Sequence, residues 1–211
     1  DIELEKVIQK YKDQTDSKYC RVVTRFADRY THPARNQETL LGKLLADAFK
    51  DVLGVDIMFL GSGSIRDEEL GPIVQYRDLL QVFPYNDEIY RICVTGEQLR
   101  RMVKRILRNE GDHAEYYQFS RGFRIEFNQK EQELISLSFN GYEVRDNDQY
   151  KLGLQSFHLK NIQDFLDVSL EEVTAIKRPK IISTKSTDVL EEYFSQYELI
   201  RVSNEQRLIL R

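Results

Sequence analysis

The sequence predicts an α+β fold in which helices pack against a mixed or antiparallel sheet. Two long segments, residues 37–53 and 95–108, carry apolar residues at helical spacing. Between Phe119 and Tyr150 the apolar period changes to two, which is typical of hairpin strands. Helices therefore come first and hairpins follow, whereas strands and helices alternate along a doubly wound sheet.

The chain is expected to open with an amphipathic helix over residues 2–12, where apolar residues recur at mostly helical spacing. A polar stretch, residues 13–18, is expected to end this helix, and a strand should follow over Tyr19–Thr24. The length of 211 residues fits one large domain, or one domain with a small appendage.

The strongest helical pattern covers residues 37–53. Asn36 is the expected N-cap, because its side chain can accept a hydrogen bond from the first helical turn. Gly54 is the expected C-cap, because glycine adopts the left-handed conformation without strain. The apolar run 55–60 that follows predicts a buried strand. The apolar face of the helix comprises Leu40, Leu41, Leu44, Leu45, Ala48, Phe49 and Val52.

The later elements follow from the same kinds of pattern. In order, we expect a short helix over 76–83, a turn at 84–87, a strand over 88–94, a long helix opened by a capping box at 95–98, hairpins over 119–150 with a turn at Asn140-Gly141, a strand over 151–157 and an amphipathic helix over 186–199. The hairpin residues expected to point inward are Phe123, Ile125, Phe127, Ile135, Leu137 and Phe139.

Charge and composition limit the possible partners. The net charge is −4, and no apolar run approaches the length of a membrane span. Residues 100–108 are rich in arginine, but their apolar residues recur at helical spacing, so the cations are expected to form a solvated helix face. Neither a nucleic acid nor a membrane is therefore an expected partner.

Two cysteines, Cys20 and Cys93, lie within strand-like runs. They either form a disulfide or remain two buried free thiols, and the second state is favoured. Free thiols would indicate a reducing compartment such as the cytoplasm; an extracytoplasmic or cell-surface location is the alternative.

A loop of small residues, Gly61–Arg66, follows the predicted buried strand and ends on a cation. Such a loop can present the Arg66 guanidinium to an anion, because small residues let the backbone approach a ligand closely. The alternative is an ion pair with Asp67 or Glu68. Arg35 precedes a helix start, where a cation is unfavourable for the helix dipole, so a ligand role is considered for it beside a solvated one.

Four segments occur in one order along the chain. They are Arg35 with 38–48 (ETLLGKLLADA), then Gly61–Arg66, Val82–Asp87 and Val94–Leu99. In this combination the chain resembles the C-terminal domain of the 5'-nucleotidase family, the bacterial relatives of UDP-sugar hydrolase. The resemblance covers nearly the whole chain: residues 1–18 are similar to the interdomain linker helix of the family, and 19–211 to the domain proper.

The resemblance implies that catalysis and substrate binding belong to two different domains. In the family, an N-terminal metallophosphatase domain holds two divalent metal ions and hydrolyses the phosphoester, while the C-terminal domain grips the nucleoside and helps to hold the phosphate. This chain would then be the substrate-binding half of a phosphohydrolase, with no catalytic residue or metal of its own and inactive by itself. Its partners would be a nucleotide and its own N-terminal domain. The chain begins at Asp1 and is expected to be an excised domain or a mature fragment.

The resemblance also assigns roles to individual residues. Arg35 and Arg66 match arginines expected to contact phosphate or ribose. Tyr85 and Phe157 match the two aromatic walls that clamp the base, and Asp87 lies in the same turn as Tyr85 as a further binding candidate. Base stacking on an aromatic ring contributes roughly 1–3 kcal/mol per base.

The sequence departs from the family after the second aromatic wall. The family has a Gly-Gly-Asp-Gly run here that supplies a carboxylate, whereas residues 160–164 of this chain read Lys-Asn-Ile-Gln-Asp. Asp164 could supply the carboxylate after a register shift, or Gln163 could form a hydrogen bond instead. His158 and Lys160 would line the same wall. The resemblance therefore does not specify which nucleotide binds.

The three histidines, His32, His113 and His158, show no metal-ligand spacing, and no metal is expected in this domain. Two other functions remain open. The pocket could have diverged into a binding or regulatory module that no longer takes nucleotides, or the domain could be a structural lid on the catalytic domain.

Overall fold

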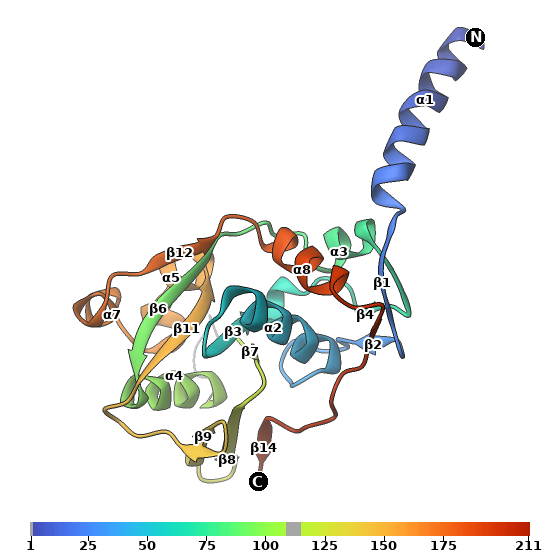
Figure 1. Ribbon diagram of the computed structural model, residues 1–211. Helices are drawn as coiled ribbons and strands as arrows, with labels where there is room; N and C mark the ends of the chain where they lie inside the picture. The colour runs from blue at the N-terminus through green and yellow to red at the C-terminus, as the bar shows by residue number, and fades with distance from the viewer. Residues whose placement is uncertain (1, 109–114) are drawn as a thin grey trace.

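The structure is a computed structural model that describes residues 2–108 and 115–211. A five-stranded sheet with the order β12-β6-β11-β3-β7 forms its centre (Figure 1). These strands are β3 (Ile57–Gly61), β6 (Ile89–Thr95), β7 (Tyr117–Phe119), β11 (Gln149–Gln155) and β12 (Lys180–Ser183). Strand β11 runs parallel to β3, and the other neighbours are antiparallel. The mixed sheet and its helices confirm the predicted α+β class.

Helices cover both faces of this sheet. The helices of the described residues are α1 (Ile2–Tyr19), α2 (Leu40–Leu53), α3 (Tyr76–Val82), α4 (Gly96–Arg108), α5 (Ser156–Lys160), α6 (Ile162–Leu166), α7 (Leu170–Ile176) and α8 (Ser186–Ser195). Helices α2 and α8 pack on one face of the sheet and α4 on the other. The side chains of β3 divide between two hydrophobic clusters: Met58 and Leu60 lie with α2 and α8, and Ile57 and Phe59 lie with α4. A strand buried on both faces is apolar throughout, which is why residues 55–60 show no alternation.

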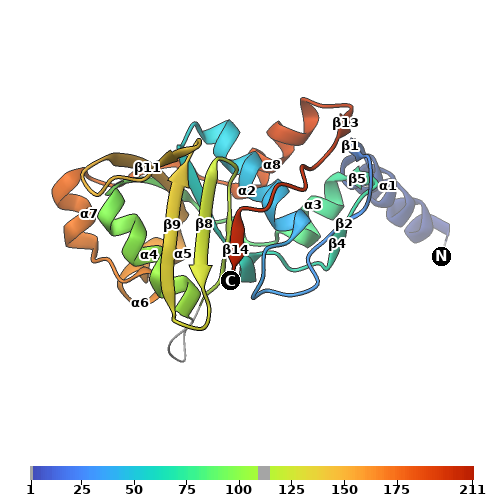
Figure 2. The same ribbon diagram turned by 90° about the horizontal axis from the view of Figure 1, so that it is seen from below.

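Three smaller sheets complete the fold. Their strands are β1 (Val22–Phe26), β5 (Ile73–Gln75) and β13 (Leu199–Ile200); β8 (Phe123–Asn128), β9 (Glu133–Phe139), β10 (Tyr142–Glu143) and β14 (Leu208–Leu210); and β2 (Tyr30–Thr31) with β4 (Glu69–Leu70). Strand β14 pairs in parallel with β8, so the end of the chain closes one side of the hairpin sheet (Figure 2).

A buried arginine fixes this last strand. Arg207, just before β14, is 2% exposed. Its guanidinium donates to Asp47 Oδ2 of α2 and to the carbonyl of Phe119, both at 2.6 Å. Its backbone N–H donates to the Glu38 carboxylate at 3.1 Å. A buried charge of this kind is tolerated only when it is paired and hydrogen-bonded, so the C-terminal segment is tied to both α2 and β7.

The cap expected at Asn36 is wrong, because Thr39 caps α2. Thr39 has an extended backbone and its side chain accepts from the Gly42 N–H at 3.0 Å. Gly54 ends the helix in the left-handed conformation with φ of 61°, which confirms the predicted C-cap. The capping box is also confirmed, since Thr95 and Gln98 exchange side chain to backbone hydrogen bonds at the start of α4.

The first helix is longer than predicted, because 13–18 continue it rather than end it. This stretch is polar but contains neither glycine nor proline, so nothing in it breaks a helix. Helix α1 projects from the body of the fold (Figure 1) and exposes apolar side chains, among them 67% of Tyr11. Strand β1 begins only at Val22, so Cys20 precedes it. Cys20 and Cys93 are both free and only half-buried, not buried as expected.

One inward position of the hairpin is wrong. A β-bulge lies between Glu126 and Phe127, where Phe127 pairs with Leu134 and Ile135 is skipped. A bulge reverses the alternation beyond it, so Ile135 is 49% exposed and Leu134 takes the inward position. The turn at Asn140-Gly141 is confirmed by positive φ angles of 50° and 83°.

The boundaries of two later elements also move. Strand β11 ends at Gln155, so Phe157 lies in α5 and not in a strand. Helix α8 ends at Ser195, which leaves Tyr197 outside the helix and 44% exposed. The predicted short helix and the strand before α4 are confirmed within one or two residues as α3 and β6.

Candidate functional site

A cavity of about 420 Å³ lies beside the ends of β3 and β11, within the size range of ligand pockets. It is lined by Arg35, Gly63, Ser64, Arg66, Tyr85, Asp87, Glu115, Phe157 and His158. The structure therefore brings together Arg35, Arg66, Tyr85, Asp87 and Phe157, all of which the sequence singled out.

The parallel pair of strands explains where the cavity lies. Because β3 and β11 are parallel, both carboxyl ends reach the same edge of the sheet. A short 3-10 helix, Ser62–Ser64, follows β3, and α5 follows β11. Ligands in open sheets of this kind commonly bind beyond the carboxyl ends of parallel strands.

Two buried glutamine side chains hold the loop after β3. Gln155 Oε1 accepts from the Gly61 N–H and from the Ser64 hydroxyl, each at 3.2 Å. Gln118 Nε2 donates to Ser62 Oγ at 3.0 Å, and its Oε1 accepts from the Thr39 N–H at 3.1 Å. Both side chains are fully buried, so these bonds are sheltered from water and fix the loop between β11, β7 and the start of α2.

His32 braces the same loop from the side of β2. Its Nε2 lies 3.2 Å from the Ser62 carbonyl, which can only accept, and its Nδ1 lies 2.8 Å from Thr39 Oγ1. This network assigns the proton to Nε2. Burial is the main cause that lowers the pKa of His32, and the nearby Arg35 charge adds to it, so the imidazole is neutral and structural.

The two arginines at the cavity are exposed and available to a ligand. The Arg66 guanidinium lies 5.8 Å from the centre of the Tyr85 ring, and its Nη1 reaches the Gly63 carbonyl at 3.5 Å. Among the residues that the structure describes, no carboxylate forms an ion pair with Arg35 or Arg66. The pairing with Asp67 or Glu68 considered for Arg66 is thus not found there.

The two aromatic candidates are exposed rather than part of the core. Tyr85 is 44% exposed and Phe157 is 52% exposed. The Phe157 ring packs against Phe165 at 5.8 Å and against His158 at 5.5 Å, which holds it at the cavity wall. Exposed rings on two separate segments that line one cavity offer flat apolar faces to a ligand.

Glu115 and His158 form the polar part of the cavity. The Gly63 N–H donates to Glu115 Oε1 at 3.1 Å. His158 Nε2 lies 4.0 Å from the same oxygen, which is too far for a hydrogen bond. Burial raises the pKa of Glu115, opposed by the Gly63 N–H and the Arg35 charge. Burial lowers the pKa of His158 to about 4, so His158 is neutral near pH 7 and the contact is not a salt bridge.

The buried imidazole predicts a pH dependence of stability. The pKa of His158 falls from 6.5 in the unfolded chain to about 4 in the folded protein. The contribution of the neutral imidazole to the free energy of unfolding is therefore complete above pH 6.5, and it is lost as the pH falls toward 4. The loss amounts to roughly 3 kcal/mol. Urea unfolding of wild type and His158→Gln should therefore show a flatter pH profile in the variant, since the other acids are common to both. Parallel profiles would contradict the buried neutral state.

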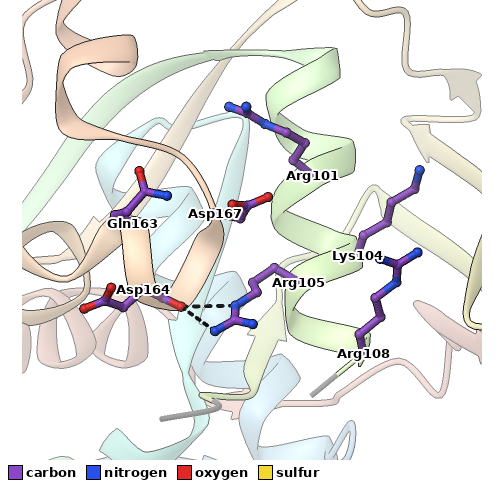
Figure 3. Close-up of a pocket in the computed structure, with 7 residues that line it drawn as sticks. All are labelled: Arg101, Lys104, Arg105, Arg108, Gln163, Asp164 and Asp167. Carbon is purple, nitrogen blue, oxygen red and sulfur yellow. Dashed lines mark hydrogen bonds between the residues drawn. The ribbon is translucent and has the colours of Figure 1, made fainter. Parts of the chain in front are cut away.

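Gln163 and Asp164 lie elsewhere. They are on α6 and line a separate cavity of about 410 Å³ with a row of cations from α4, namely Arg101, Lys104, Arg105 and Arg108 (Figure 3). The Asp164 carbonyl accepts two hydrogen bonds from Arg105, at 3.0 and 3.1 Å. The helical conformation is interrupted at Asn161, between α5 and α6. This interruption changes the direction of the chain, so that α6 lies against α4. Neither residue lines the cavity beside Phe157.

The site residues that were not singled out differ in how clearly the sequence indicates them. The sequence contains a signal for Gln118, because an amide between two aromatic residues of the short strand β7 needs a hydrogen-bond partner once it is buried. Gln155 ends a strand and resembles many surface residues. Glu115 precedes β7 without any motif, so only the folded chain shows that it reaches Gly63.

In the described ranges, 2–108 and 115–211, no cluster of three His, Cys, Asp or Glu side chains could hold a metal ion. His113, considered at the sequence level, lies outside those ranges. No helix within them has the length and apolar character needed to cross a membrane.

Residues 15–168 match the family described as 5'-nucleotidase, C-terminal domain. The chain belongs to this family. Among curated family relatives, a 5'-nucleotidase of Vibrio parahaemolyticus is 23% identical over 172 residues, which cover 80% of this chain and 29% of the relative. Protein UshA of Escherichia coli is 24% identical over 121 residues, or 57% of this chain and 22% of the relative. The matches thus span between about a fifth and three tenths of those proteins.

Solved structures share the fold of this family member. A 5'-nucleotidase precursor of Thermus thermophilus superposes with a TM-score of 0.75 at 13% identity, over 100% of this chain and 43% of that one. The NAD nucleotidase of Haemophilus influenzae gives 0.76 at 14%, over 100% and 41%. A Thermus thermophilus sulfate thiohydrolase, solved with glycerol, gives 0.71 at 14%, over 99% and 38%.

Proposed function

We propose that this domain binds a nucleotide and sets the substrate specificity of a 5'-nucleotidase-type phosphohydrolase. The observation that carries the proposal is the convergence of Arg35, Arg66, Tyr85 and Phe157 on one cavity from four separate segments of the chain. An exposed cation pair beside two exposed rings suits a ligand with an anionic and a flat aromatic part.

Each residue then has a role that follows from its chemistry. The guanidinium groups of Arg35 and Arg66 hold the phosphate, because their planar donors match its oxygens. Tyr85 and Phe157 stack on the base, which contributes roughly 1–3 kcal/mol per base. Asp87 accepts a hydrogen bond from the ligand at the rim.

The chemistry belongs to another domain in this proposal. Residues 1–18 form the linker helix and 19–211 the binding domain, in a longer protein whose N-terminal metallophosphatase domain holds two divalent metal ions. Those ions supply the nucleophile, while this domain removes orientational freedom from the substrate. The small share of the curated relatives that this chain covers supports such an arrangement. By itself the chain should not hydrolyse phosphoesters.

Replacing Tyr85 with alanine should weaken nucleotide binding about tenfold, since one stacking face is lost. The measurement is calorimetry and thermal shift of the 211-residue chain with nucleosides, nucleotides and UDP-sugars at millimolar concentration. Tyr142→Ala is a matched control, because Tyr142 is 80% exposed on β10 and outside the cavity.

A thermal shift for one nucleotide class that is lost in the Tyr85 variant and kept in the Tyr142 variant would support the base clamp. If folded wild type shows no shift with any ligand, and the longer protein hydrolyses nucleotides at the same rate with and without Tyr85→Ala, the proposal fails.

A second candidate is a binding or regulatory module that no longer takes nucleotides. One observation favours it: Gln163 and Asp164, the residues available to replace the family carboxylate, lie at a different cavity. A protein of the same fold is named a sulfate thiohydrolase, so the fold itself does not require a nucleotide. The ligand panel decides between the two, because a module of this kind would bind none of the nucleotides.

A further inference from the structure

Glu115 is a fixed carboxyl group at the ligand cavity. It lines the cavity, and its side chain is 23% exposed. The Gly63 N–H holds Oε1 at 3.1 Å, so the loop after β3 sets the position of the group. A side chain that a protein hydrogen bond already holds in place loses little freedom when a ligand binds.

One oxygen of this carboxyl group is free. Within the described part of the chain only Oε1 accepts a hydrogen bond, and His158 Nε2 approaches the same oxygen at 4.0 Å. Oε2 thus faces no protein donor there. Because the Glu115 side chain is partly exposed and Oε2 is not a fully buried atom, a donor on a ligand can reach this oxygen in place of water.

The charge of the cavity indicates which part of the ligand Glu115 contacts. A carboxylate and a phosphate both accept hydrogen bonds and repel each other. The phosphate therefore belongs at Arg35 and Arg66, and the Glu115 carboxylate belongs beside the uncharged nucleoside. Ribose hydroxyls and base N–H groups are the donors that a nucleoside offers.

We propose that Glu115 recognises a neutral hydrogen-bond donor of the nucleoside, and so supplies from the segment before β7 the carboxylate that Gln163 and Asp164 do not supply at this cavity. The inference rests on the proposed nucleotide-binding function. The donor is either a ribose hydroxyl or a base N–H, and both sources share the chemistry that Oε2 requires.

His158 fixes the cavity wall beside Glu115. Its imidazole packs directly on Gly61, where a Cβ would lie 2.1 Å from Cε1, and edge-on to Tyr117 with ring centres 5.0 Å apart. It is 2% exposed, and its Nδ1 has no hydrogen-bond partner among the described residues. The ring is therefore held in place by its packing, and it fixes the wall against which Glu115 lies.

The test compares ligands that keep or lose each donor. Binding of AMP, GMP, CMP and UMP to the 211-residue chain is measured by calorimetry for wild type, Glu115→Gln and Glu133→Gln. The tightest ligand is then replaced by its 2',3'-dideoxy analogue and by an analogue without the base amino or imino N–H. The amide of Glu115→Gln can still accept from Gly63, but its NH₂ cannot accept from the ligand. Glu133 is an exposed carboxylate on β9 and serves as the control.

Glu115→Gln should weaken the natural nucleotide at least tenfold and Glu133→Gln should leave it unchanged. Removing the recognised donor from the ligand should weaken wild type equally, but have no further effect on Glu115→Gln. If the 2',3'-dideoxy analogue shows this pattern, the recognised donor is on the ribose; if the analogue without the base N–H shows it, the donor is on the base. Glu115→Asp, which keeps the charge, should retain part of the discrimination.

Two outcomes would overturn the inference. If wild type binds nucleotides and Glu115→Gln binds them equally well, or loses affinity equally for every analogue, Glu115 does not read a donor, although the nucleotide-binding proposal stands. If wild type binds none of the ligands, and the longer protein hydrolyses nucleotides at the same rate with and without Tyr85→Ala, both proposals fall together.

Discussion

Arg66→Ala should lower the affinity for a nucleotide about ten- to hundredfold, while the affinity for the corresponding nucleoside stays nearly unchanged. Hydrogen bonds to a charged group contribute about 1.5–3 kcal/mol, and Arg66 is an exposed cation at the cavity with no ion pair in the described part of the chain. Calorimetry with a nucleoside and its 5'-monophosphate measures the difference directly.

The control for this variant is Arg124→Ala, an exposed arginine on β8. In the longer protein, Arg66→Ala should reduce kcat/KM by the same factor as the affinity. Unchanged turnover would instead identify the domain as a structural lid that contacts the substrate little. An equal loss for nucleoside and nucleotide would show that Arg66 does not hold the phosphate.

Arg207→Ala should reduce the free energy of unfolding by about 3–5 kcal/mol, because it leaves Asp47 as a half-paired charge beneath the C-terminal strand. The arginine side chain is 3% exposed and its pair with Asp47 spans 2.6 Å. Urea unfolding measures the change in midpoint at constant slope.

Arg211 provides the matched control at the other end of β14. It pairs with Glu126, but its side chain is 66% exposed. Exposed pairs contribute about 0–1 kcal/mol, so Arg211→Ala should have little effect. Equal effects of the two variants would contradict the assignment of Arg207 as the anchor of the C-terminal segment.

The helix α2 and the strand β3 were predictable because their signals are local. A one-sided apolar pattern and Gly54 define the helix, and an uninterrupted apolar run defines the strand. The true cap, Thr39, was missed because Asn36 is an equally good capping residue. Only the bonds from Thr39 to His32 and Gln118 fix the helix start.

Errors arose where long-range pairing decides the outcome. The bulge that exposes Ile135 depends on the register of β8 against β9, which no local pattern contains. The direction of Asp164 depends on the break at Asn161 and on hydrogen bonds from Arg105 of α4. The site shows the same limit. Its arginines and aromatic residues were found through the ordered motifs, but Glu115 belongs to no motif and only the folded chain places it at the cavity.

The buried amides beneath the loop after β3 have a practical consequence. Gln118 and Gln155 carry no charge at any pH, and their bonds to the loop are shielded from salt. A phosphate monoester, by contrast, loses its second proton near pH 6. The hydrogen bonds that these amides make to the loop should stay the same throughout that titration, so the change of affinity with ionic strength becomes a readout of the ligand charge at Arg35 and Arg66.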